Sequence, residues 1–173
     1  MKQAYVDPER VIAVSVRAVR KTYGPKTAVE NMNLEIYRGE IFGLIGANGA
    51  GKTTTVECVL GTRSFDSGSV TVLGMNPAID RKRLFSRVGV QFQETRFQDR
   101  ITVTEACETA AALYPRARDW RPLLDRFALA GRERSPVNSL SGGERQKLAV
   151  ILALIPDPEL QVPIVPYGKK TAR

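Results

Sequence analysis

The chain contains a glycine-rich segment of eight residues that ends in a lysine and a threonine: Gly46-Ala47-Asn48-Gly49-Ala50-Gly51-Lys52-Thr53. Its spacing fits GxxxxGK[ST]. Glycines at these positions let the backbone curl so that several N–H groups point at phosphate oxygens. A helix that begins at Lys52 would add the positive end of its dipole. The segment therefore predicts a polyphosphate site, and the alternative is an ordinary glycine-rich turn.

Two side chains of this segment carry further chemistry. Lys52 has the reach to contact β- and γ-phosphates, and the Thr53 hydroxyl can ligate Mg²⁺. We therefore expect a nucleotide to contact the following residues of the loop and the helix start: Gly46, Asn48, Gly49, Ala50, Gly51, Lys52, Thr53 and Thr54.

A second candidate for anion binding lies at Leu140-Ser141-Gly142-Gly143-Glu144, where a serine and two glycines precede an apolar helical pattern. Two such loops of one sheet cannot easily hold a single phosphate, so the second loop suggests a partner subunit. The alternative is a helix start with Ser141 as N-cap and Glu144 at the N3 position of a capping box.

The elements that must position these loops follow from periodicity and turn residues. Alternation or short apolar runs predict strands at 11–20, 34–37, 41–45, 69–73 and 88–92. The run at 41–45 is nearly continuous, as in a strand buried on both faces of a parallel sheet. Helical spacing predicts helices at 52–60, from 102, around 123–127 and from 143. Strands followed by a helical block indicate an α/β core with a helical insertion.

Composition narrows the classes of protein. A length of 173 residues with 43% hydrophobic content suits one domain, and the sequence has no histidine. No apolar run approaches the ~20 residues that cross a bilayer, and the N-terminus does not resemble a secretory signal, so we expect a cytoplasmic protein. Its formal net charge of +8 comes from scattered basic residues without interleaved aromatics, so no nucleic acid is expected. Cys58 and Cys107 are expected to be buried free thiols.

Together these motifs resemble the ABC ATPase family, from about Val14 to Leu160. Leu140-Ser141-Gly142-Gly143-Glu144 looks like its LSGGE signature. Tyr23 matches the aromatic residue that stacks on adenine, with turn packing as the alternative role. Gln93 matches the glutamine that senses Mg²⁺, with Gln91 as an alternative register. Residues 46–77 look most like the ATPases of ABC-2-type drug exporters.

The resemblance implies a P-loop NTPase core with an antiparallel β subdomain and a helical subdomain at about 95–145, within a domain of residues 1–160. It implies ATP and Mg²⁺ as cofactors, with Thr53 and Gln93 at the metal and Gln93 and Ser141 as catalytic residues. The signature residues would contact the nucleotide of a second ABC ATPase subunit in a homodimer or heterodimer: Ser141, Gly142, Gly143 and Glu144.

The resemblance also implies a transmembrane ABC permease as partner. The chain would then lie in the cytoplasm, peripherally on the inner face of the cell membrane. It would couple ATP binding and hydrolysis to transport. A non-catalytic nucleotide-binding fragment and a soluble ABC ATPase without a transport role are the alternatives.

The family pattern continues with an apolar strand that ends in the Walker B Asp and the catalytic Glu, and later with the H-loop His. Here no acidic residue follows Glu159, and Pro163 and Pro166 are expected to forbid a central strand. We therefore expect a core without its C-terminal part, a disordered non-family tail at 161–173 and poor hydrolysis. A frameshifted or prematurely ended product would explain this. Asp157 or Glu159 as a substitute base, against simple turn residues, is the alternative.

Overall fold

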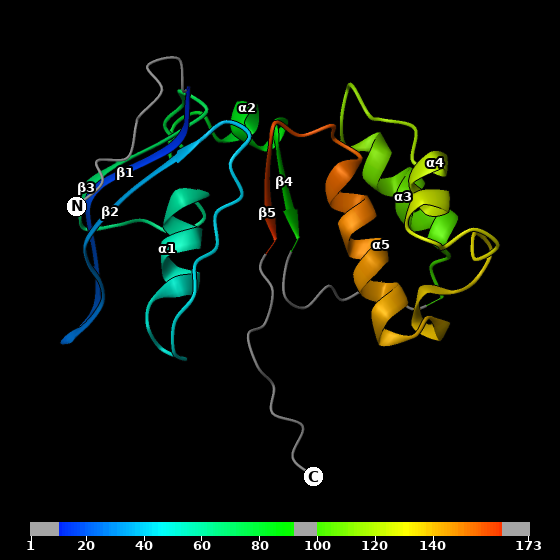
Figure 1. The fold of residues 1–173 in the computed structure, drawn as a ribbon, viewed down its shortest axis with the longest axis horizontal. Helices are drawn as coiled ribbons and strands as arrows, with labels where there is room; N and C mark the ends of the chain where they lie inside the picture. The colour runs from blue at the N-terminus through cyan, green and yellow to red at the C-terminus, as the bar shows by residue number, and fades with distance from the viewer. Residues whose placement is uncertain (1–10, 92–99, 164–173) are drawn as a thin grey trace, which may run out of the picture. The chain divides into compact units, whose positions relative to one another are not determined.

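The structure is a computed structural model, and it describes residues 11–91 and 100–163. The chain divides into two compact units, Met1–Leu84 and Phe85–Arg173. The first contains the following elements, which Figure 1 labels: β1 Ile12–Tyr23, β2 Lys26–Tyr37, α1 Lys52–Val59, β3 Ser67–Val72 and the start of α2 Arg81–Phe85.

An antiparallel sheet in the order β2-β1-β3 forms the body of the first unit. β1 and β2 form a hairpin whose turn contains Gly24 at φ +54°, and Tyr23 pairs with Lys26 across it. Alternate residues of β1, such as Val14 and Val16, are buried, as the period of 2 predicts. The predicted strands at 11–20, 34–37 and 69–73 are confirmed, as is the antiparallel β subdomain.

Helix α1 contacts all three strands of this sheet (Figure 1). It buries Thr55, Cys58 and Val59. Beyond its C-cap, Gly61 adopts φ +67°, and a Cβ built there would lie 2.5 Å from the carbonyl oxygen of Pro77. A glycine is therefore needed where the helix ends. The predicted helix at 52–60 is confirmed.

The expected strand at 41–45 is wrong. The structure gives these residues no strand geometry, and Ile41 and Ile45 are 101% and 77% exposed. A strand buried on both faces needs hydrogen-bonded neighbours at its edges. Within residues 11–91 and 100–163 no strand pairs with this segment. Its apolar side chains therefore remain at the surface of this chain.

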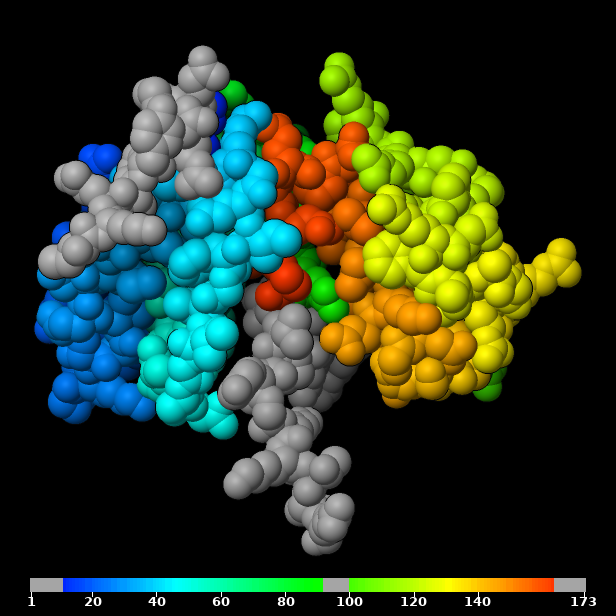
Figure 2. All heavy atoms as spheres, in the orientation of Figure 1, coloured from blue at the N-terminus to red at the C-terminus, as the bar shows by residue number. Residues whose placement is uncertain are grey.

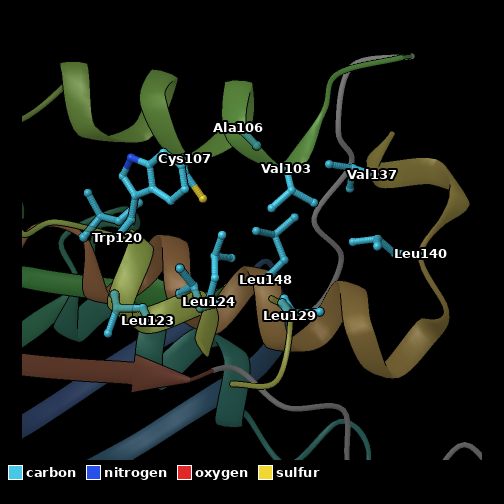
Figure 3. Close-up of a cluster of buried hydrophobic side chains, with 12 residues drawn as sticks. Val103, Ala106, Cys107, Trp120, Leu123, Leu124, Leu129, Val137, Leu140 and Leu148 are labelled. Carbon is cyan, nitrogen blue, oxygen red and sulfur yellow. The ribbon is translucent and has the colours of Figure 1, made fainter. Parts of the chain in front are cut away.

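The second unit combines a parallel strand pair with a helical block. Its elements are β4 Val88–Gln91, α3 Val103–Ala112, α4 Arg121–Arg126, the 3-10 helix η1 Val137–Ser139, α5 Gly142–Leu154 and β5 Leu160–Pro163. The three α-helices enclose one apolar cluster (Figure 3). Thr102 and Glu105 form a capping box that fixes the start of α3. The predicted helical block is confirmed.

β5 corrects a second expectation. We expected Pro163 to prevent a strand, but Leu160–Pro163 pairs in parallel with β4, with Val88 opposite Leu160 and Gln91 opposite Pro163. Pro163 is the last residue of β5, so its missing N–H falls where the ladder ends. The rest of the tail, residues 164–173, lies outside the described residues.

Candidate nucleotide-binding site

The glycine-rich loop before α1 curls through two residues in the left-handed region. Gly49 has φ +83° and Gly51 has φ +80°. Between them, the N–H of Ala50 donates to the carbonyl oxygen of Ala47 at 3.2 Å. Only glycine adopts such angles at little cost, so these two positions explain the loop's composition.

Close backbone contact with strand β2 also fixes the loop. A Cβ built on Gly51 would lie 2.0 Å from the carbonyl oxygen of Ala28 in β2. The buried Thr55 donates to the carbonyl oxygen of Gly51 from both its N–H (2.8 Å) and its hydroxyl (3.0 Å). The close approach of the loop and the start of α1 to β2 therefore depends on the absence of a side chain at Gly51.

The first turn of α1 is open at the surface. Among the described residues, no side chain caps this helix, and no hydrogen bond engages the N–H groups of Lys52, Thr53 and Thr54. By contrast, capping boxes close the first turns of α3 and α5. Most residues of the loop are exposed, and Figure 2 shows the cyan segment that leads into α1 at the surface. Open N–H groups and the helix dipole together favour an anion at this turn.

Lys52 reaches back over the loop. Its ammonium donates to the carbonyl oxygens of Gly46 at 2.6 Å and Ala47 at 2.7 Å. The side chain is therefore folded along the loop itself, with its positive charge at the carbonyl oxygens of Gly46 and Ala47.

Tyr23, the predicted nucleobase platform, ends β1 and is 41% exposed. The Lys21 ammonium lies 5.6 Å, and the central guanidinium carbon of Arg63 5.5 Å, from its ring centroid. Strand β2 links this ring to the loop, since Lys26 pairs with Tyr23 and Ala28 lies against Gly51. Two residues of a strand span about 7 Å, a distance that one nucleotide can bridge.

Sequence reasoning missed one polar group beside this platform. Asp66 accepts hydrogen bonds from the N–H and the hydroxyl of Thr22, and these bonds, with one from Lys21, lower its pKa to about 2. In the sequence alone, Asp66-Ser67-Gly68 indicates only a turn. The partners are 44 residues apart, so no local pattern indicates the contact.

The signature segment belongs to the second unit and forms the N-terminus of α5. Leu140 is buried in the helical cluster (Figure 3), whereas Ser141, Gly142 and Gly143 are exposed. The Ser141 hydroxyl accepts from the N–H of Glu144 at 3.2 Å, and the Glu144 carboxylate accepts from the N–H of Ser141 at 2.8 Å. The capping box that the sequence offered as an alternative is therefore present.

Two arginines reinforce this helix start. The Arg132 guanidinium donates to the carboxylate of Glu144 at 3.1 Å, and that of Arg145 donates to the carbonyl oxygen of Leu140 at 2.7 Å. The pKa of Glu144 is lowered, first by the hydrogen bond from the backbone of Ser141. Sequence reasoning did not identify either arginine.

The remaining candidate residues belong to the second unit or lie outside the described residues. Gln93 lies outside the described residues, and Gln91 lies in β4 opposite Pro163. Asp157 forms an ion pair with Arg118, and Glu159 forms one with Arg87.

Two absences hold for the part of the chain that the structure describes. Within residues 11–91 and 100–163, no three Asp, Glu, Cys or His side chains cluster as metal ligands. No helix in the same ranges is both long and apolar enough to span a membrane.

Comparison with known proteins gives consistent matches. The family model described as ABC transporter matches residues 29–162. Nod factor export ATP-binding protein I of Ralstonia nicotianae is 38% identical over 154 residues, which cover 86% of this chain and 48% of that protein. The chain thus spans about half the length of the curated relatives it matches.

Comparison with solved structures supports the same fold. An ATP-binding subunit of an ABC transporter matches with a TM-score of 0.79 and 25% identity, over 87% of this chain and 65% of that one. The protein cbiO1 from Clostridium perfringens, part of the ABC transporter complex cbiONQ, matches with a TM-score of 0.75 and 21% identity, over 88% and 64%. The expected fold class, an α/β P-loop NTPase core with an antiparallel β subdomain and a helical insertion, is confirmed.

Proposed function

Because this chain belongs to the ABC transporter family, we propose that it binds Mg-ATP at residues 46–54 and serves as the ATP-binding part of a transporter. The observation that carries the proposal is the open first turn of α1. Its uncapped N–H groups adjoin a loop that Gly49 and Gly51 curl and a lysine that can reach phosphate. Each feature by itself is ordinary, but together they match what a triphosphate requires.

Binding requires Lys52 to exchange partners. Its ammonium now donates to the carbonyl oxygens of Gly46 and Ala47. A β- or γ-phosphate at the open turn offers negatively charged acceptors, and hydrogen bonds between charged groups are stronger than those to neutral carbonyls. The lysine would therefore turn from the loop to the phosphate.

Thr53 can supply a protein ligand to Mg²⁺. It is exposed in the same turn, so its hydroxyl can face a cation held mainly by phosphate oxygens and water. Bound Mg²⁺ would neutralise charge on the β- and γ-phosphates. We propose Gln93 as the second protein ligand and the residue that senses the metal, by resemblance to the family.

The nucleobase would stack on Tyr23. The ring is part-exposed at the end of β1, and β2 connects it to the loop at Gly51. Aromatic stacking suits a nucleobase because every base presents a flat π face.

A second ATPase subunit would complete the site. Ser141, Gly142 and Gly143 are exposed at a helix N-terminus, where they can contact the γ-phosphate bound by another copy or by a related subunit. The capping role of Ser141 does not conflict with this, since a hydroxyl has a proton to donate as well as lone pairs to accept. We propose catalytic roles for Ser141 and Gln93 on this basis.

For these 173 residues taken alone we propose binding with poor hydrolysis. The attacking water needs a carboxylate base. Asp157 and Glu159, the last acidic residues of the sequence, pair with Arg118 and Arg87. These ion pairs favour a structural role for both carboxylates, and they make a non-catalytic nucleotide-binding chain the second candidate function.

We further propose a transmembrane ABC permease as the partner, at the inner face of the cell membrane. The relative in Ralstonia nicotianae is named for export of Nod factor, which supports an export role here without identifying the substrate. Because the basic residues are scattered along the sequence, we propose no nucleic-acid partner.

Two measurements on the chain test this proposal. Equilibrium binding of a ribose-labelled fluorescent ATP analogue, with Mg²⁺, should saturate. Phosphate release from ATP under the same conditions should stay near background. Saturable binding without release supports both statements. An absence of binding would refute the site, and release at rates ordinary for ATPases, about 1 per second or more, would refute poor hydrolysis.

A further inference from the structure

One carboxylate holds the end of strand β1 just before the predicted nucleobase platform. Asp66 accepts hydrogen bonds from the N–H of Thr22 at 2.6 Å and from its hydroxyl at 2.7 Å. The Lys21 ammonium donates to the other carboxylate oxygen at 3.2 Å, and the N–H of Asp66 donates to the carbonyl oxygen of Arg20 at 2.8 Å. Three consecutive residues that lead to Tyr23 are therefore tied to one aspartate.

These bonds replace a missing part of the sheet. The ladder between β1 and β3 shifts between Arg17 and Arg20, and its last pair is Arg20 with Ser67. β3 begins at Ser67, so no β3 residue lies opposite Thr22. The Asp66 side chain takes the position of a ladder partner and accepts the N–H of Thr22.

The platform itself is only partly buried. Tyr23 is 41% exposed, and its ring lies near two cations, Lys21 and Arg63. Each cation is restrained by a carboxylate, Lys21 by Asp66 and Arg63 by Glu57 of α1. Polar contacts therefore surround the ring in addition to its partial burial, and Asp66 holds both the preceding backbone, at Thr22, and one of the two cations, Lys21.

We propose that Asp66 is a positioning residue for the nucleobase: by holding Thr22 and Lys21 it fixes the Tyr23 ring on which the base stacks. The inference rests on the proposed function, because it assumes a nucleotide whose phosphates bind at Lys52. It predicts that losing Asp66 weakens recognition of the base and leaves recognition of the phosphates unchanged.

Competition against the ribose-labelled ATP analogue separates these two effects. ATP competes through base and phosphates, whereas inorganic tripolyphosphate competes through phosphates alone. For Asp66→Ala we expect ATP to bind about 10-fold more weakly, within the range that loss of base stacking produces. Tripolyphosphate should compete as well as it does with the unaltered chain, to within about 2-fold.

Two comparisons make the test specific. Adding Asp66→Ala to Tyr23→Ala should cause no further loss of ATP affinity, because both changes act on one contact. Asp80→Asn is the matched control, since Asp80 also accepts a backbone N–H in the first unit, from Asn76 at 3.0 Å, and its hydrogen bonds and ion pairs among the described residues do not involve Tyr23, Lys21 or Arg63. It should leave both affinities unchanged.

If Asp66→Ala does not fold, Asp66→Asn serves in its place, because its amide oxygen can still accept from Thr22 while its charge beside Lys21 is lost. ATP affinity should then fall by about 3-fold, with tripolyphosphate again unaffected. Unchanged ATP affinity, or an equal loss for ATP and tripolyphosphate, would overturn the inference. Failure of the unaltered chain to bind either compound would instead overturn the proposed function.

Discussion

The ammonium of Lys52 lies 2.6 Å from the carbonyl oxygen of Gly46, six residues earlier in the same loop. With the contact to Ala47, this bond closes the loop over its own first residues. The N–H groups at the start of α1 have no side-chain cap among the described residues. The curvature of the loop and the positive charge of Lys52 are therefore already in place in the structure, and in the proposed function this lysine would turn toward the phosphate.

The contact between Gly51 and β2 gives the first prediction. Gly51→Ala would place a Cβ against the carbonyl oxygen of Ala28 at a residue with φ +80°. Positive φ alone costs about 1–2 kcal/mol, and the backbone clash adds to it, so we expect a loss of more than about 2 kcal/mol in unfolding free energy. Urea unfolding of the variant and the unaltered chain measures this loss of unfolding free energy.

Gly49→Ala is the matched control for that change. Gly49 has a similar φ of +83°, but a Cβ there meets nothing within 4 Å among the described residues. It should lose only the roughly 1–2 kcal/mol of the dihedral penalty. Equal losses for the two variants would contradict the proposed close contact at Gly51.

The burial of Leu140 beside the exposed signature glycines gives the second prediction. Leu140 is 3% exposed within the helical cluster, so Leu140→Ala should lower the unfolding free energy by about 2–5 kcal/mol. Leu113 is 74% exposed, and Leu113→Ala should change the unfolding free energy by less than about 0.5 kcal/mol. Chemical denaturation measures both changes. A loss of less than about 0.5 kcal/mol for Leu140→Ala would mean that the cluster does not anchor the signature segment.

Two helices with the same capping box provide the third prediction. Ser141→Ala and Thr102→Ala each remove the side chain that caps a helix, at a cost of about 1 kcal/mol in unfolding free energy. Only Ser141→Ala should also weaken ATP-dependent self-association, measured by light scattering, because only that hydroxyl is proposed to face a second subunit's phosphate. Comparable effects of both variants on association would assign Ser141 to capping alone.

The thiol of Cys107 gives a prediction that depends on pH. Burial, and then the charge of Glu108, raises the pKa of Cys107 from its ordinary value of 9.0 to about 12. The folded chain should resist alkylation of this thiol at pH 8 and react once unfolded in urea, as peptide mass spectrometry can show. Rapid alkylation of the folded chain would contradict the burial.

The same shift affects stability at high pH. The unfolded thiol loses its proton near pH 9, whereas the folded thiol keeps it to about pH 12. The free energy of unfolding should therefore fall as the pH rises from about 9 to 12, and this group contributes no change below that window.

The parts of the fold that could be predicted from sequence are those set by local chemistry. Ser141 precedes an apolar helix and Glu144 stands three residues later in its first turn, and this spacing indicates a capping box. Gly61 marks the end of α1 because its backbone needs positive φ. Such signals lie within one turn of chain and require no knowledge of distant partners.

Long-range pairing accounts for what the sequence did not show. The apolar run at 41–45 resembles a buried strand, but strand formation depends on neighbours that the described residues do not supply. Pro163 was expected to exclude a strand, although at the last position of β5 its missing N–H matters little. The link between Asp66 and Thr22 joins residues distant in sequence, so no periodicity could predict it.

Nucleotide binding by Lys52→Ala tests the central claim most directly. Titration of the ribose-labelled ATP analogue with Mg²⁺ should show affinity reduced by about 30-fold or more, because the variant loses a charged hydrogen-bond donor to phosphate. Lys82→Ala, which removes an exposed lysine of α2, should bind like the unaltered chain. If Lys52→Ala binds the analogue as tightly as the unaltered chain does, the nucleotide is not held at this loop.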